Sequence, residues 1–181
     1  MIEMMGVLAI IGVLSVGGIA GYSQAMSKFK ISKTIDQAQM LITNIRTLYS
    51  SSRKYTGISP LQAYNMGLLT DESFNPTNNT GLNPFGGQIQ FGIAEAGRAF
   101  TISYTGLTNE SCVRLATADW GADQSSGLRS IEISGEGGTS FIKHIWPSEG
   151  GTESTALPVE LPHAITQCGT SNSGTIRWTY R

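Results

Sequence analysis

A long stretch without charge lies at the N-terminal end of the chain. Residues 4–27 carry no charged side chain, and Glu3 is the only charge before Lys28. A helix rises about 1.5 Å per residue, so a helix over this stretch would be about 36 Å long, slightly more than the roughly 30 Å hydrocarbon core of a bilayer. The sequence therefore predicts a helix of membrane-spanning length.

A segment of this composition can be a cleaved signal peptide, a plain membrane anchor or a helix that assembles with other helices. A cleaved signal peptide is disfavoured because no Lys or Arg precedes Lys28 and the apolar run is too long. A plain membrane anchor explains the length, but it explains neither Glu3 nor the glycines, which are Gly6, Gly12, Gly17, Gly18 and Gly21. An acid inside a membrane is costly and usually functional, and small residues let helices approach closely. The stretch favours helix–helix assembly, with a plain anchor as the alternative.

The order of residues here resembles the N-terminal signature of type IV pilins and pseudopilins. The matching segments are Ile2-Glu3-Met4-Met5 and Val7-Leu8-Ala9-Ile10-Ile11-Gly12-Val13-Leu14. The resemblance implies a leader removed by a prepilin peptidase, a methylated N-terminus, and a Glu3 that neutralises the N-terminal amine of a neighbouring subunit. Gly12 matches the glycine that follows the acid. Family members carry two more residues before the acid, so the chain is expected to begin just inside the mature N-terminus.

A second helical pattern follows without a break. Apolar residues recur every three or four positions, as on one face of an amphipathic helix: Ile31, Ile35, Ala38, Ile42, Ile45 and Tyr49, flanked by Leu41 and Leu48. No proline occurs before Pro60, so we expect one helix from near Met1 to about Ser51. The chain then divides into an apolar membrane or filament-core helix at 1–27, its amphipathic continuation at 28–52, and a globular head at 53–181.

Two features of this helix have more than one interpretation. Gly17, Gly18 and Gly21 suit either close packing or a stretch that melts when a filament is under tension. Lys28, Lys30 and Lys33 follow the apolar run and, taken alone, place the rest of the chain in the cytoplasm. The basic leader that the resemblance implies would reverse this orientation. The three lysines also suit anchoring at a membrane boundary.

The remaining pattern predicts an α+β head. Ser59-Pro60 favours the start of a short helix with Leu61, Tyr64, Leu68 and Leu69 on its apolar face. A second helix is expected to follow Thr108 as its N-cap. Strands are expected at 88–93, 99–105, 130–134, 140–146 and 175–180, with a connecting region at 53–87 and a loop at 148–162. The pattern does not place residues 119–129.

The chain has two cysteines, Cys112 and Cys168. In a membrane-tethered chain with no other thiol, one disulfide is favoured over two free thiols, and it would bound the region 112–168. The segment from Gly106 to Leu115, the Asn83-Pro84-Phe85 turn, and a cysteine shortly before the last strand resemble type IVb pilins of enteric bacteria and conjugation systems. The long helix without proline resembles the same subclass.

Nothing in the sequence indicates catalysis or a cofactor. The net charge of −1, with 14% charged residues, disfavours a nucleic-acid binder that works through bulk electrostatics. His144 and His163 are expected to be structural or surface residues, and their distance from the cysteines disfavours a metal site. The nearby acids are Asp119, Asp123, Glu132 and Glu136, and the pattern fixes no geometry among them. We expect no enzyme, no cofactor and no metal.

These observations and the resemblance predict the subunit of a type IVb pilus. Such a chain would sit in the inner membrane with its head in the periplasm, pass to the assembly machinery, and polymerise with identical copies into an extracellular filament. The filament would contact host or neighbouring cells in adhesion, aggregation or mating. Two alternatives remain: a minor pilin or pseudopilin, and a monomeric anchored adhesin or DNA receptor. The cysteines count against a pseudopilin, and the last alternative leaves Glu3 and the glycines unexplained.

Overall fold

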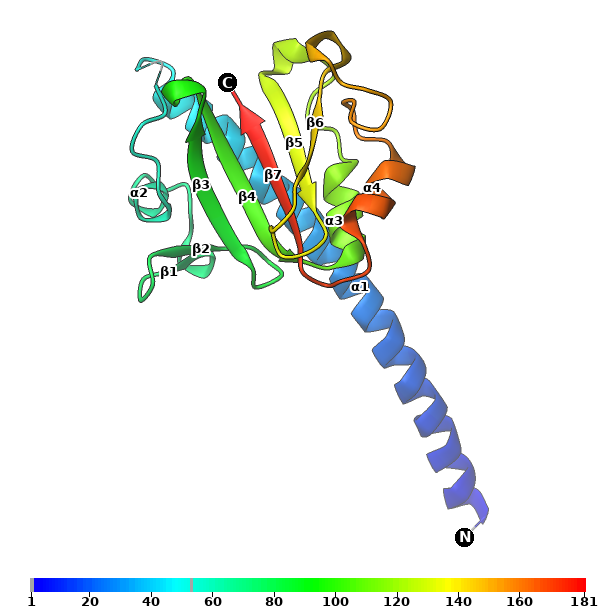
Figure 1. Cartoon of the computed structure of the whole chain (residues 1–181). Coiled ribbons are helices and arrows are strands. Elements are labelled where there is room, and N and C mark those ends of the chain that lie inside the picture. Colours follow the sequence, from blue (N-terminus) through cyan, green and yellow to red (C-terminus); the bar gives the residue numbers. More distant parts are fainter. Residues whose placement is uncertain (1, 53) are drawn as a thin grey trace.

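The computed structural model describes the backbone of residues 2–52 and 54–181 and the side chains of residues 6–52 and 54–181. A long N-terminal helix packs its C-terminal half behind an antiparallel sheet, and its N-terminal half projects away from the head (Figure 1). Short helices lie near both edges of the sheet (Figure 1). The expected α+β architecture is confirmed.

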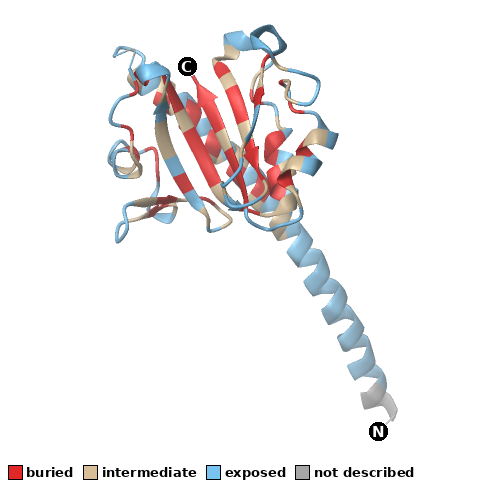
Figure 2. Ribbon diagram, in the orientation of Figure 1, coloured by how far each residue is buried: buried red, intermediate tan, exposed pale blue. Residues whose placement is uncertain are grey.

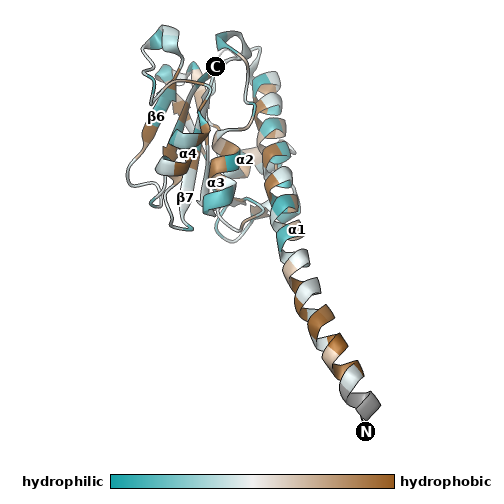
Figure 3. Ribbon diagram, turned by 90° about the vertical axis from the view of Figure 1, so that its right-hand side faces the viewer, coloured by the Kyte–Doolittle hydropathy of each residue, from teal (hydrophilic) through white to brown (hydrophobic). Residues whose placement is uncertain are grey.

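Helix α1 runs from Ile2 to Tyr49 without interruption, over 48 residues. The predicted apolar face is the face that packs on the head: Ile31, Ala38, Ile42 and Ile45 are buried, together with Leu41. Leu48, near the C-terminal end of the helix, is 49% exposed. Figure 3 shows the change in character along the helix, from a mostly hydrophobic projecting half to a half with alternating faces.

The sheet has seven strands in the order β1-β2-β3-β4-β7-β5-β6. Their bounds are Phe74–Asn75, Thr80–Leu82, Gln88–Ala94 and Ala99–Leu107 for β1 to β4, and Leu128–Ser134, Ile142–Ile145 and Gly174–Tyr180 for β5 to β7. The last strand of the chain therefore lies between β4 and β5, at the centre of the sheet. All five expected strands are present with small shifts at their ends. β1 and β2 lie where only turns were expected. They are joined by two residue pairs, and strands this short show no alternation of apolar and polar residues in the sequence.

Helix α2 spans Pro60–Asn65, and the Ser59 hydroxyl accepts a hydrogen bond from the Gln62 N–H as its N-cap. The expected apolar face was wrong at Leu61, whereas Tyr64 packs against the core as expected. Leu61 is 41% exposed, and the buried helical residue is Ala63. Gly67, at φ +73°, lies in a left-handed conformation that ends the helix. Leu68 and Leu69 are buried after the helix has ended.

Helix α3 spans Asn109–Ala116, and the Thr108 hydroxyl caps it by accepting from the Ser111 N–H, as predicted. Helix α4 spans Leu161–Cys168, and the sequence analysis missed it because its N-cap, Glu160, makes no side-chain capping bond. Four short 3₁₀ turns complete the secondary structure: Asp71–Ser73, Glu95–Gly97, Gln124–Ser126 and Pro147–Glu149.

The core lies between α1 and the sheet, and aromatic residues of the two central strands occupy it. Tyr104 on β4 packs edge-on against Trp178 on β7 at 5.5 Å between ring centroids. The Tyr104 hydroxyl donates a hydrogen bond to Gln37 Oε1 of α1 at 3.2 Å. Phe100 and Ile102 are fully buried beside Tyr104, which confirms the predicted alternation along β4. This packing attaches the amphipathic half of α1 to the head.

Candidate functional site: the projecting helix

The most unusual surface of the molecule is the projecting half of α1. Every residue from 6 to 25 is exposed (Figure 2). The exposed side chains include large aliphatic ones such as Val13 at 75%, Val16 at 71% and Ile19 at 70%. By length and composition this helix can cross a membrane. A continuous apolar surface of this extent needs lipid or other protein around it, since water exposure is unfavourable.

The two serine hydroxyls of this segment are satisfied within the helix itself. Ser15 donates to the carbonyl oxygen of Ile11 at 2.7 Å, and Ser23 donates to that of Ala20 at 2.9 Å. Such bonds to the preceding turn satisfy both serine hydroxyls without water. Neither serine therefore prevents burial of the segment in an apolar environment.

The glycines of the projecting helix have no function within the monomer. A Cβ atom built on Gly6, Gly12, Gly17, Gly18 or Gly21 meets no atom within 4 Å. Gly17 and Gly21 are four residues apart and so share one face of the helix. Small residues at this spacing let a second helix approach closely. The fold of one chain therefore gives no reason for the glycines, whereas contact with another helix does.

The remaining predicted positions on α1 lie at its N-terminal end and near its middle. Glu3 belongs to the helical backbone, but its side chain lies outside the described residues, so its role stays a prediction. Lys28 and Lys33 are exposed and Lys30 is half-buried, where the helix enters the head. The Lys33 ammonium lies 3.4 Å from Glu72, and both side chains are largely exposed, so this ion pair contributes little to stability.

The disulfide between Cys112 and Cys168 is present and fully buried. It joins α3 to the last residue of α4, across 56 positions of sequence, with the Cα atoms 5.9 Å apart. The segment from α4 to β7 is thereby tied to the helix that follows β4. The expected bond and the region that it bounds are both part of the fold.

Both histidine side chains contact other residues of the head. His144 is 1% exposed, and its ring nitrogens lie 3.2 Å from the Ala156 carbonyl oxygen and 2.5 Å from Gln167 Oε1. It therefore links β6, the loop before α4, and α4 itself. His163 lies 4.0 Å from Glu160 one turn away on the surface.

The acids considered in the sequence analysis do not converge. Asp123 caps the turn at Gln124–Ser126, where hydrogen bonds from Ser125 hold the pKa of its carboxyl below the usual range. Asp119 accepts from the Gly121 N–H at 3.1 Å, and Glu132 pairs with Arg177 at 2.9 Å. Within the described part of the chain, no three His, Cys, Asp or Glu side chains are grouped as a metal site requires.

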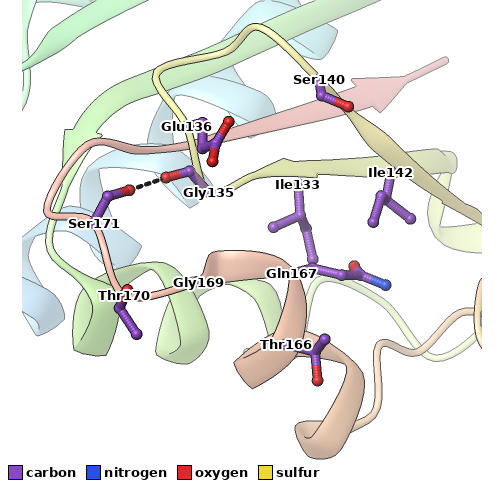
Figure 4. Close-up of a pocket in the computed structure, with 10 residues that line it drawn as sticks. All are labelled: Ile133, Gly135, Glu136, Ser140, Ile142, Thr166, Gln167, Gly169, Thr170 and Ser171. Carbon is purple, nitrogen blue, oxygen red and sulfur yellow. Dashed lines mark hydrogen bonds between the residues drawn. The ribbon is translucent and has the colours of Figure 1, made fainter.

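A hollow of about 390 Å³ lies beside α4 (Figure 4). Its walls come from β5, the loop after β5, α4 and the segment that leads to β7. Glu136 is the only ionisable side chain among its lining residues, and Ser171 donates to the Gly135 carbonyl oxygen across one edge. Among the described residues, no hydrogen bond joins the Glu136 carboxylate to a hydroxyl of this lining, as a base and its nucleophile would require.

Comparison with known proteins agrees with this anatomy. Residues 28–181 match the family model described as PilS N terminal. The major structural subunit of the bundle-forming pilus of Escherichia coli O127:H6 is 30% identical over 177 residues, which are 96% of this chain and 88% of that protein. The corresponding subunit of Escherichia coli O111:H- is 29% identical over 177 residues, which again cover 96% of this chain and 88% of that protein.

A solved structure shares the fold. TcpA, a type IV pilin from Vibrio cholerae El Tor biotype, superimposes with a TM-score of 0.52 at 17% identity, covering 84% of this chain and 99% of that one. The structure has a long helix, an antiparallel sheet and a C-terminal disulfide. The family model matches most of the chain, and the pilus-subunit relatives align with almost all of it. The chain belongs to the PilS N-terminal family and is a type IV pilin of the type IVb subclass.

Proposed function

We propose that this chain is the major structural subunit of a type IVb pilus, which polymerises with identical copies through its projecting helix. The observation that carries the proposal is the exposed apolar helix whose glycines make no contact within the monomer. Buried among neighbouring helices, this surface would lose its contact with water, and the glycines would set how closely the helices approach. The relatives described as major structural subunits of a bundle-forming pilus support the same role.

The same helix would hold the chain in the inner membrane before assembly. Its apolar half is long enough to span the bilayer, and Lys28 and Lys33 lie where the head begins. The disulfide suits a head that folds in the periplasm, since such bonds persist in oxidising compartments. A prepilin peptidase would remove the leader and expose the N-terminal amine.

Glu3 would then act during docking. An unpaired carboxylate is costly in an apolar filament core, and an opposite charge on the neighbouring N-terminus relieves that cost. This pairing would set the axial register between successive subunits. The chain's role is thus structural and not catalytic, and the finished filament would contact host or neighbouring cells.

The proposal is tested by electron microscopy of filaments sheared from cells that express the chain with its native leader. Antibody to the head should label the whole length of thin filaments. Label confined to filament tips would instead identify a minor pilin. Label confined to the membrane fraction would identify a pseudopilin or an anchored receptor, and either result overturns the proposal.

Two substitutions separate assembly from folding. Glu3→Ala should insert into the membrane and form the Cys112–Cys168 bond, yet yield few filaments. Glu153→Ala removes an exposed acid of the head and should leave filament yield unchanged. Abundant normal filaments from Glu3→Ala would remove Glu3 from the mechanism.

A further inference from the structure

The outer face of the sheet, opposite α1, carries a polar trough that pilus assembly through α1 does not use. Figure 1 looks directly onto this face, with α1 behind the strands. The hollow measures about 460 Å³, within the range of about 300–1,000 Å³ typical of small-molecule sites. We call it the outer-face trough and define it by its floor and two walls.

Small side chains form the floor, and strand register brings them into one row. Gly92 pairs with Thr101, Thr101 with Thr179, and Thr179 with Ser130, across β3, β4, β7 and β5. A Cβ atom on Gly92 would lie 2.6 Å from the Thr101 hydroxyl, so glycine keeps this end of the floor open. The floor therefore presents three hydroxyl groups in a line.

One of these hydroxyls has no partner. Ser130 is 1% exposed, and among the described residues its Oγ makes no hydrogen bond. A buried polar atom without a partner is unfavourable, and natural proteins rarely leave one unexplained. Because Ser130 lines the hollow, a ligand in the trough would supply the missing partner.

Long charged side chains in the adjacent row form the first wall. Arg177 pairs in register with Glu132, and Glu132 pairs with Lys143. The Arg177 guanidinium is held in place by Glu132 at 2.9 Å and Ser103 at 3.0 Å, and it stacks over the Phe141 ring at 4.3 Å. Such a fixed wall is preorganised for a ligand.

The opposite wall holds one cation, Arg129, between two acids, so the cation of the trough without an ion pair lies on the first wall. Arg129 lies 2.7 Å from Glu149 and 3.9 Å from Glu95. Lys143 makes no ion pair within 4.0 Å among the described residues, although it lines the trough. A matching ligand therefore carries several hydroxyl groups for the floor and one negative charge for Lys143.

We propose that the outer-face trough binds a pyranose sugar that carries a carboxylate, such as a uronic acid. The sugar hydroxyls would donate to and accept from Thr101, Thr179 and Ser130, and the carboxylate would lie against Lys143. The trough lies on the face of the sheet away from α1, so burial of α1 does not by itself cover it. The inference does not depend on assembly and can be tested on the unassembled chain.

The test is isothermal titration of the full chain, purified in a detergent without sugar head groups, with D-glucuronate as the probe. D-glucose lacks the charge and acetate lacks the hydroxyls. Each should bind at least about tenfold more weakly than glucuronate, because one charge-assisted hydrogen bond, or two to three neutral ones, is worth about that factor. Acetate binding as tightly as glucuronate, or no heat with glucuronate at millimolar concentration, overturns the proposal.

Variants locate the site. Lys143→Gln should weaken glucuronate binding about tenfold, and Ser130→Ala should weaken it measurably, with unchanged thermal unfolding. Lys54→Gln removes an exposed lysine outside the trough and should have no effect. Equal affinity in Lys143→Gln and Lys54→Gln would rule out this site. Tighter binding of a glucuronate-containing oligosaccharide than of the monosaccharide would indicate a polysaccharide as the source, and equal binding would indicate a single sugar.

Discussion

Cys112 and Cys168 join the middle of α3 to the end of α4, and both are completely buried. For a loop of this length, the chain-entropy model assigns the bond about 4 kcal/mol of stability. Replacing both cysteines by serine should therefore lower the denaturant midpoint of the full chain in detergent and speed proteolysis within residues 112–168. Chemical reduction of the unchanged chain is the control and should act in the same direction. An unchanged midpoint in both experiments would remove the disulfide from the stability argument.

A substitution at Gly17 distinguishes effects on monomer stability from effects on filament assembly. Leucine favours a helix over glycine by up to about 1 kcal/mol, and a Cβ atom at Gly17 meets nothing within 4 Å. Gly17→Leu should therefore leave the monomer as helical and as stable as before, yet reduce filament yield by blocking close helix approach. Val16→Leu, at a neighbouring exposed position, is the control. The measurements are circular dichroism in detergent and filament counts by electron microscopy; equal filament counts for the two variants contradict the packing role.

Leu41 and Leu48 lie seven residues apart on the same side of α1, but only Leu41 is buried. Leu41 is 0% exposed in the core, and Leu48 is 49% exposed. Leu41→Ala should lower the free energy of unfolding by about 2–5 kcal/mol, because it removes buried contacts and leaves a cavity. Leu48→Ala should change it by less than about 0.5 kcal/mol. Chemical denaturation followed by tryptophan fluorescence compares the two, and similar losses would mean that the packed face of α1 has been misassigned.

Asn83 organises the turn before β3. It is 4% exposed; its amide donates to the Thr105 carbonyl oxygen at 2.8 Å, and its Oδ1 accepts from the N–H groups of Phe85 and Gly87 at 2.9 and 3.1 Å. Asn83→Ala leaves these buried groups without partners and should cost about 1–3 kcal/mol in unfolding free energy. Asn78→Ala, on the exposed turn between β1 and β2, should cost little. Equal unfolding midpoints for the two variants contradict this account.

Tyr104 and Tyr180 should make the fold sensitive to alkaline pH. Burial raises the pKa of Tyr104 well above its ordinary value of 10.0. Burial also raises the pKa of Tyr180, with Arg46 opposing and Asp119 adding to the shift. Below pH 10 both the folded and unfolded states keep these protons. Above it the unfolded chain releases them and the folded chain does not, so the free energy of unfolding falls by up to about 1.4 kcal/mol per pH unit for each group.

The measurement is the unfolding free energy between pH 8 and pH 11. Tyr104→Phe should be less stable than the unchanged chain at pH 8, because it loses the hydrogen bond to Gln37, but should decline less steeply above pH 10. Tyr104→Phe combined with Tyr180→Phe should flatten the decline further. A Tyr104→Phe curve that runs parallel to that of the unchanged chain throughout this range would show that Tyr104 does not cause the alkaline loss.

The sequence alone determined the features that depend on neighbouring residues along the chain. The extent of α1, its buried face, and the Ser59 and Thr108 caps all follow from interactions within about four residues. The alternation along β4 and β7 was readable for the same reason, because side chains of a strand point to opposite faces in turn. The N-terminal signature and the two cysteines carried the family resemblance.

Only the tertiary structure decided how distant segments meet. Leu61 satisfies a helical apolar pattern but is exposed, because the turn at Gly67 directs Leu68 and Leu69 into the core instead. Helix α4 has no capping bond from Glu160 and is held by its packing and by Cys168. The floor of the outer-face trough draws on strands from β3 to β7. Its alignment depends on strand register, which is set by long-range pairing and burial that no local pattern encodes.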